Sequence, residues 1–122
     1  MLYSLESGTP FWVREIPHKK DYDIWCDRIS KTDYQTIVDH LYSLFEASEV
    51  QTSSWIPGSD WSDTLFEPIY HACRRDVNAA AQFYGLILWD VMMRRGDSWS
   101  FGRYEKNGIP IKGLTYFKIQ KP

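Results

Sequence analysis

Aromatic side chains are the residues in this sequence whose type and spacing suggest a binding site. The chain of 122 residues contains six Trp, eight Tyr and six Phe. Each buried ring of this kind removes about 150–250 Å² from water, and the core of one small domain does not plainly need so many. We therefore expect several of these rings to line a cleft or an interface.

The segment 55–61 is the first candidate for such a cleft. Trp55 and Trp61 lie on either side of the turn dipeptide Pro57-Gly58, next to the carboxylate of Asp60. Indole faces stack on flat or cationic groups, and a carboxylate fixes the orientation of a ligand. The alternative is that both indole rings cover one end of the core.

Two aromatic residues of a later expected hairpin could complete this cleft. The sequence thus predicts that a small molecule or a peptide binds to a set of five residues. They are Trp55, Asp60, Trp61, Trp99 and Tyr104.

The basic C-terminal quarter supports a second hypothesis, binding of single-stranded nucleic acid. Residues 91–122 contain seven Lys and Arg but two Asp and Glu, whereas residues 1–90 contain seven and fourteen. Cations that bind phosphate and rings that stack on bases are the usual combination for this function. The candidate contacts are Arg94, Arg95, Arg103, Lys112 and Lys118. The net charge of −2 favours the alternative, in which these cations face water or pair with the acidic remainder.

Three residues spaced four apart, Glu67, His71 and Arg75, would share one face of a helix. Such a face could perform acid–base chemistry on a phosphate ester, although a solvated ladder of charges is the commoner arrangement. The sequence contains no HExxH, P-loop, GxSxG or GxGxxG motif. We therefore predict no catalytic residue, no metal site and no cofactor.

Asp90 and the two cysteines are the remaining reactive groups. Asp90 interrupts an apolar helical segment, and we expect it to face outward or to pair with Arg94, four residues later. Cys26 and Cys73 have no metal-ligand spacing. Two free thiols in a reducing compartment are therefore favoured over a single disulfide.

Helix signals dominate the middle of the chain. A capping box at Thr32 and Gln35 opens an amphipathic helix over 33–48, and a second box at Thr64 and Glu67 opens one over 65–75. Asp76 is placed to cap a third helix over 77–95, which Gly96 would end.

Patterns typical of β-strands lie near both ends of the sequence. A run of β-forming residues over 11–16 and alternating residues over 22–28 predict an antiparallel hairpin, with a helical turn over 22–30 as the competing interpretation. Asn107-Gly108 predicts a hairpin between 98–105 and 109–119.

Together these elements predict an α+β fold in one domain spanning 1–122. Its antiparallel sheet would come from the N- and C-terminal hairpins, with three helices packed on one face. No apolar run reaches the roughly 20 residues that cross a bilayer, and no signal peptide is visible. We therefore expect a cytoplasmic protein without membrane contact. An exposed aromatic patch would also suit a homo-oligomer or a protein partner.

Overall fold

The fold is that of a computed structural model, which describes residues 1–5, 11–46, 50–52, 64–103, 105–106, 108–110 and 114–120. The helices are α1 (Lys19–Cys26), α2 (Lys31–Glu46), α3 (Glu67–Ala72) and α4 (Val77–Arg94). The strands are β1 (Leu2–Ser4), β2 (Phe11–Val13), β3 (Val50–Thr52), β4 (Trp99–Gly102), β5 (Glu105–Lys106), β6 (Ile109–Pro110) and β7 (Thr115–Lys118).

The main sheet is mixed, which confirms the α+β class but corrects the prediction of a wholly antiparallel sheet. Its strand order in the described chain is β2-β1-β4-β7-β3. β1 runs parallel to β4, with Leu2 opposite Trp99, whereas the other neighbouring pairs are antiparallel. The Ser100 hydroxyl donates to the Tyr3 carbonyl at 2.8 Å and adds a side-chain bond to this parallel pair.

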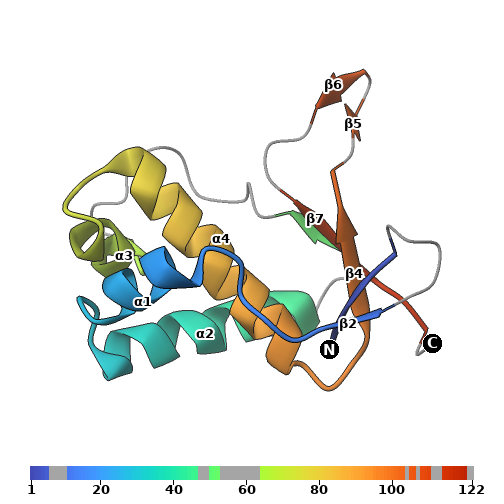
Figure 1. The fold of residues 1–122 in the computed structure, drawn as a ribbon, viewed down its shortest axis with the longest axis horizontal. Coiled ribbons are helices and arrows are strands. Elements are labelled where there is room, and N and C mark those ends of the chain that lie inside the picture. Colours follow the sequence, from blue (N-terminus) through green and yellow to red (C-terminus); the bar gives the residue numbers. More distant parts are fainter. Residues whose placement is uncertain are drawn as a thin grey trace.

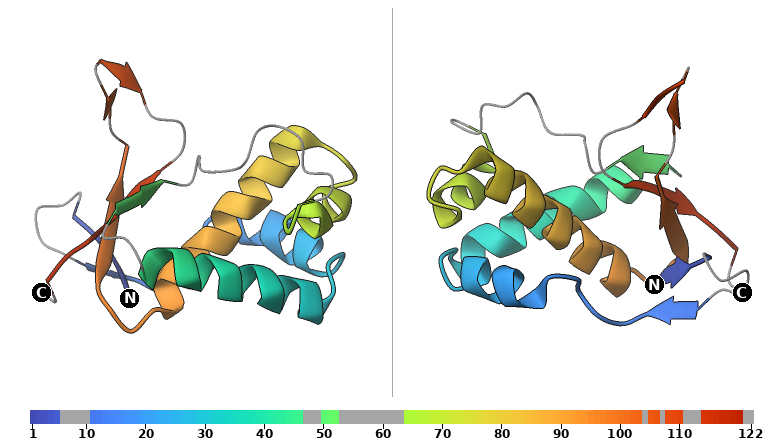
Figure 2. Two further views of the ribbon diagram at one scale, coloured as in Figure 1. Left: turned by 180° about the vertical axis from the view of Figure 1, so that it is seen from behind. Right: turned by 45° about the horizontal axis from the view of Figure 1, so that its top comes forward.

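All four described helices lie on one side of this sheet (Figure 1), as both views in Figure 2 also show. One more helix is present than the sequence predicted, because α1 replaces an expected strand. The two layers meet at Phe45 of α2, whose ring packs edge-on against Trp99 at 5.0 Å and Tyr116 at 6.2 Å between centroids. The core therefore sits between α2, α4 and the centre of the sheet.

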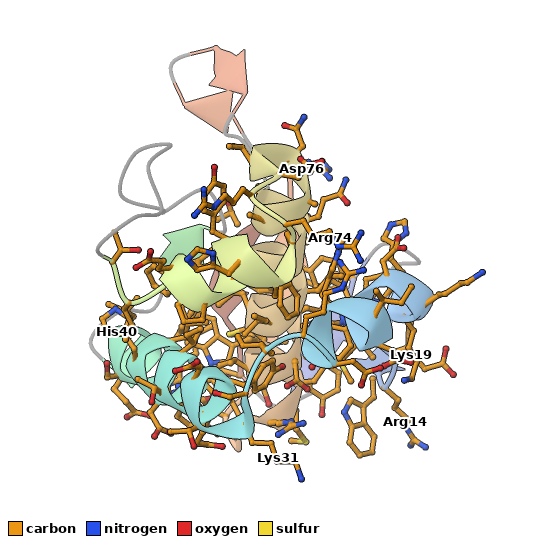
Figure 3. All side chains as sticks on the ribbon, turned by 90° about the vertical axis from the view of Figure 1, so that its left-hand side faces the viewer. Arg14, Lys19, Lys31, His40, Arg74 and Asp76 are labelled. Atoms are coloured by element: carbon orange, nitrogen blue, oxygen red, sulfur yellow. The ribbon has the colours of Figure 1, made fainter. Side chains whose placement is uncertain are left out.

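α4 is the central helix, and its sequence explains why. Its middle is apolar on several faces, so most of it is buried by the other helices and the sheet. Asp76 caps it as predicted, because its Oδ1 accepts the backbone N–H groups of Asn78 and Ala79 at 3.0 and 3.1 Å. Figure 3 shows Asp76 at the start of this helix. No helix in the described ranges is long and apolar enough to span a membrane.

The predicted hairpin of 11–16 and 22–28 is wrong, because residues 19–26 form α1. The alternation of apolar residues also fits a helix, in which Tyr22, Trp25 and Cys26 share one face. That face packs against the core, whereas Ile24, which a strand would have buried, is 42% exposed. The bidentate pair of Lys19 with Asp23, at 2.9 and 3.0 Å, supports the helix from outside. The N-terminal hairpin consists of β1 and β2 instead.

The other predicted elements form close to their expected positions. α2 begins two residues early because Ser30, not Thr32, caps it: the Ser30 Oγ accepts the Asp33 N–H at 3.0 Å. α3 is shorter than the predicted 65–75. The C-terminal hairpin is present as β4 with β7 and, further out, β5 with β6. Gly108 has φ 79°, the left-handed conformation that this turn requires.

Candidate functional site

The residues predicted to wall an aromatic cleft are not gathered at one described site. Trp55, Asp60, Trp61 and Tyr104 lie outside the described residues. Trp99 is described, and its side chain has no exposed surface because it packs under Phe45 in the core. In this structure Trp99 therefore supports the fold and offers no face to a ligand.

The predicted nucleic-acid contacts are also spread over different environments. Lys112 lies outside the described residues. Arg95 is 4% exposed and is held by Asp97 and Glu46, while Arg94 binds Asp90 at 2.9 Å. Lys118 lies 3.7 Å from Asp97, and Arg103 is exposed at the end of β4. The four described cations thus do not present one continuous surface, and Arg103 is the one that borders the larger of two described cavities.

That cavity is a cleft of about 630 Å³ between α1, α4 and the ends of β4 and β7. α1 and the turn before it supply one wall, and α4 supplies the floor. Arg103, Leu114 and Tyr116 form the opposite wall. Indole rings of Trp25 and Trp89 line it, so the cleft is aromatic-walled but uses different tryptophans from those the sequence indicated.

Small residues shape the floor of this cleft. Ala81, Gly85 and Trp89 follow one another at four-residue spacing along α4 and lie on the same face of the helix. A Cβ built on Gly85 meets no atom of the described residues within 4 Å. The glycine is therefore not required by a close backbone contact in this part of the chain, and its missing side chain leaves the floor hollow.

Both indole rings are held in place by the rest of the fold. Trp25 packs against Phe83 with ring centroids 5.6 Å apart. Trp89 packs edge-on against Phe101 at 4.7 Å, and its Nε1–H donates to the Glu15 carbonyl at 3.0 Å. Rings fixed in this way lose little conformational freedom when a ligand stacks on them.

Charged side chains stand at opposite walls of the cleft. His18, which precedes α1 with φ 51°, and Asp21 in its first turn lie on one side. Arg103 lies on the other side. With the side chains that the structure describes, neither Asp21 nor Arg103 forms an ion pair within 4.0 Å.

A second cavity of about 520 Å³ borders a hydrogen-bonded chain that joins three helices. The hydroxyls of Tyr22 and Tyr34 bond to each other, Tyr34 donates to Asp90 Oδ2 at 2.9 Å, and Arg94 Nε donates to Asp90 Oδ1 at 2.9 Å. Burial raises the pKa of both phenols, so they remain neutral donors. The predicted pair of Asp90 with Arg94 is confirmed, although the carboxylate itself is buried.

This network satisfies both oxygens of Asp90 with partners from the protein. It joins α1, α2 and α4 and leaves the buried carboxylate paired and hydrogen-bonded, as a charge in a core must be. We therefore regard it as a structural element, and the first cleft as the better candidate site.

The predicted acid–base face on α3 forms in part. His71 Nε2 lies 3.2 Å from Glu67 Oε1 at an exposed position. Arg75 does not join them because α3 ends at Ala72 and Arg75 has φ 62° beyond the helix. The ladder thus stops at His71, and nothing in the described surroundings encloses a substrate there.

Cys26 and Cys73 are free thiols. Burial raises the pKa of the Cys73 thiol to about 12 and also raises that of Cys26. Thiols with raised pKa values are poor nucleophiles near neutral pH, so neither residue suggests covalent catalysis. Within the described ranges, no cluster of three His, Cys, Asp or Glu residues could hold a metal ion.

The spacing of residues in α4 contains one indication of the cleft that the amino-acid composition does not contain. Ala81 and Gly85 are small residues one turn apart, on a face of α4 outside its expected apolar stripe, and Trp89 follows them. Such a spacing leaves a shallow groove beside a large ring. Comparisons with protein-family models, with curated proteins and with solved structures found no match for this chain.

Proposed function

We propose that this protein binds a small molecule in the cleft between α1, α4 and the ends of β4 and β7. The observation that carries the proposal is Gly85, a mid-helix glycine at the floor of a cleft that is lined by two fixed tryptophans. The proposal keeps the aromatic-walled site that composition predicts but assigns it to Trp25 and Trp89 in place of Trp55, Trp61 and Trp99.

The energetics of Gly85 support a role beyond folding. A glycine in a helix interior destabilises that helix by about 0.5–1 kcal/mol relative to alanine. In α4 no described atom would obstruct a larger residue at this position. Gly85 therefore lowers the stability of α4 without relieving a steric conflict with any described atom. We attribute its presence to the open space that it leaves above the helix.

The size and lining of the cleft also suit a small organic ligand. Its volume of about 630 Å³ lies within the range of roughly 300–1,000 Å³ that is typical of such sites. Its lining combines aromatic and aliphatic side chains with a few polar groups, as ligand sites usually do. The apolar lining supplies contact area, and the polar groups limit which ligands fit.

We predict that Gly85→Leu abolishes ligand binding while the protein stays folded. Leucine is a better helix former than glycine, and its side chain would occupy the floor of the cleft. The experiment is a thermal-shift screen of a fragment library, in which compounds that raise the melting temperature of the wild type should leave that of Gly85→Leu unchanged.

Gly96→Ala is the matched control, because a Cβ at Gly96 also meets no described atom within 4 Å and Gly96 does not line the cleft. This variant should respond to the same compounds as the wild type does. Stabilising compounds that act equally on Gly85→Leu would show that the ligand binds elsewhere.

A further inference from the structure

We propose that the ligand of this cleft is a planar aromatic anion, with its ring beside Trp25 and Trp89 and its acidic group at Arg103. The inference rests on the proposed function and adds the chemical class of the ligand. It follows from the juxtaposition of two fixed indole rings with a cation at one wall of the cleft.

The ring specificity comes from the two tryptophans. Ring contacts with Phe83 and Phe101 hold Trp25 and Trp89, respectively, in place at the lining of the cleft. A flat ligand can stack on an indole or meet it edge-on with centroids about 4.5–7 Å apart. The absent side chain of Gly85 leaves room for the ligand to lie close to the helix backbone between them.

The charge specificity comes from the contrast between Arg103 and the other arginines near the sheet and α4. Arg94 is paired with Asp90, and Arg95 is enclosed by Asp97 and Glu46. Among the side chains that the structure describes, a carboxylate lies within 4.0 Å of Arg94 and of Arg95 but not of Arg103. Its guanidinium is exposed at the end of β4 and lines the cleft, where it can bind a carboxylate, sulfonate or phosphate through two parallel N–H donors.

The opposite wall fixes the direction in which such a ligand lies. Asp21 stands on the α1 side of the cleft and would repel an anion there. The acidic group of the ligand must therefore point to the sheet side, and its ring toward α1. Asp21→Asn should consequently leave anion binding intact or strengthen it, whereas Arg103→Gln should weaken it.

The test uses two fluorescent probes that share one aromatic body. Anilinonaphthalene sulfonate is an anion, and phenylnaphthylamine is its neutral parent without the sulfonate. Dissociation constants are measured by fluorescence titration for the wild type, Arg103→Gln, Asp21→Asn and Gly85→Leu. Arg75→Gln is the control for net charge, because Arg75 is exposed and lines neither cavity.

We expect the wild type to bind the sulfonate about tenfold more tightly than its neutral parent, as one charge-assisted contact allows. Arg103→Gln should reduce this preference to within about twofold, and Arg75→Gln should preserve it. Equal binding of both probes, or a preference that survives in Arg103→Gln, would overturn the inference while leaving the cleft as a binding site. Absence of binding by both probes, or binding that Gly85→Leu does not reduce, would instead contradict the proposed function.

Discussion

Replacing Arg95 with methionine should lower the free energy of unfolding by about 2–4 kcal/mol. The guanidinium is 4% exposed. It donates to both Asp97 oxygens at 2.8 and 2.9 Å, to Glu46 at 2.9 Å and to the Tyr42 carbonyl at 3.2 Å. Methionine would fill the space but leave these acceptors unpaired. The expected loss is smaller than for a fully buried pair because Glu46 is 68% exposed.

Urea denaturation measures this effect, with Lys118→Met as the control. Lys118 is the other cation near Asp97, but at 3.7 Å and with 46% exposure. An exposed pair of this kind contributes about 0–1 kcal/mol. Equal losses in the two variants would show that Arg95 does not organise this region.

The pH dependence of stability gives an independent check on Arg95. Its hydrogen bonds are the main cause that lowers the pKa of Asp97 from 3.8 to about 2. Because the folded-state pKa is lower than the unfolded one, this contribution to stability is present above about pH 4 and is lost as the pH falls toward 2. In Arg95→Met this component should disappear, so the acid-induced loss of stability between these pH values should be smaller.

Replacing Trp99 with alanine should lower the free energy of unfolding by about 3–5 kcal/mol. Trp99 has no exposed side-chain surface, and its ring meets Phe45 nearly perpendicularly at 5.0 Å. Removing it would leave a large cavity between the helical layer and the centre of the sheet. This result would assign Trp99 to the core and not to an open cleft.

Trp12→Ala is the matched control for this truncation. Trp12 is 47% exposed on the edge strand β2, where its main described contact is the guanidinium of Arg14 at 4.2 Å from the ring centroid. Its removal should cost about 0.5–1 kcal/mol. If denaturation curves show the same loss for both tryptophans, then Trp99 does not anchor the core.

The sequence predicted two features of the fold that depend on local chemistry. The Asp76 cap and the left-handed Gly108 are decided within a few residues, and both are present. The parallel pair of Leu2 with Trp99 depends on residues far apart in the chain, and no local pattern indicates it. The prediction of a strand over 22–28 is wrong because the alternating residues of this segment also fit a helical period.

The difference between local patterns and contacts of distant residues also explains why the candidate site was predicted with other tryptophans. Composition predicts an aromatic-walled site, but which tryptophan is buried depends on the packing of distant elements. Trp99 packs under Phe45 of α2, and Trp89 is left at the cleft because Gly85 and Ala81 precede it on the helix. Arg103 reaches the same cleft only because β4 ends beside α4, a contact that local sequence does not specify.

The most direct test of the cleft is to observe the indole N–H signals of the tryptophans by NMR during a titration with a ligand from the screen. Single Trp→Phe variants assign the signals. We predict that the signals of Trp25 and Trp89 shift, while that of the buried Trp99 does not. If Trp55 and Trp61 respond and Trp25 and Trp89 stay unchanged, the ligand binds in the segment that the sequence favoured, and the account of the cleft is contradicted.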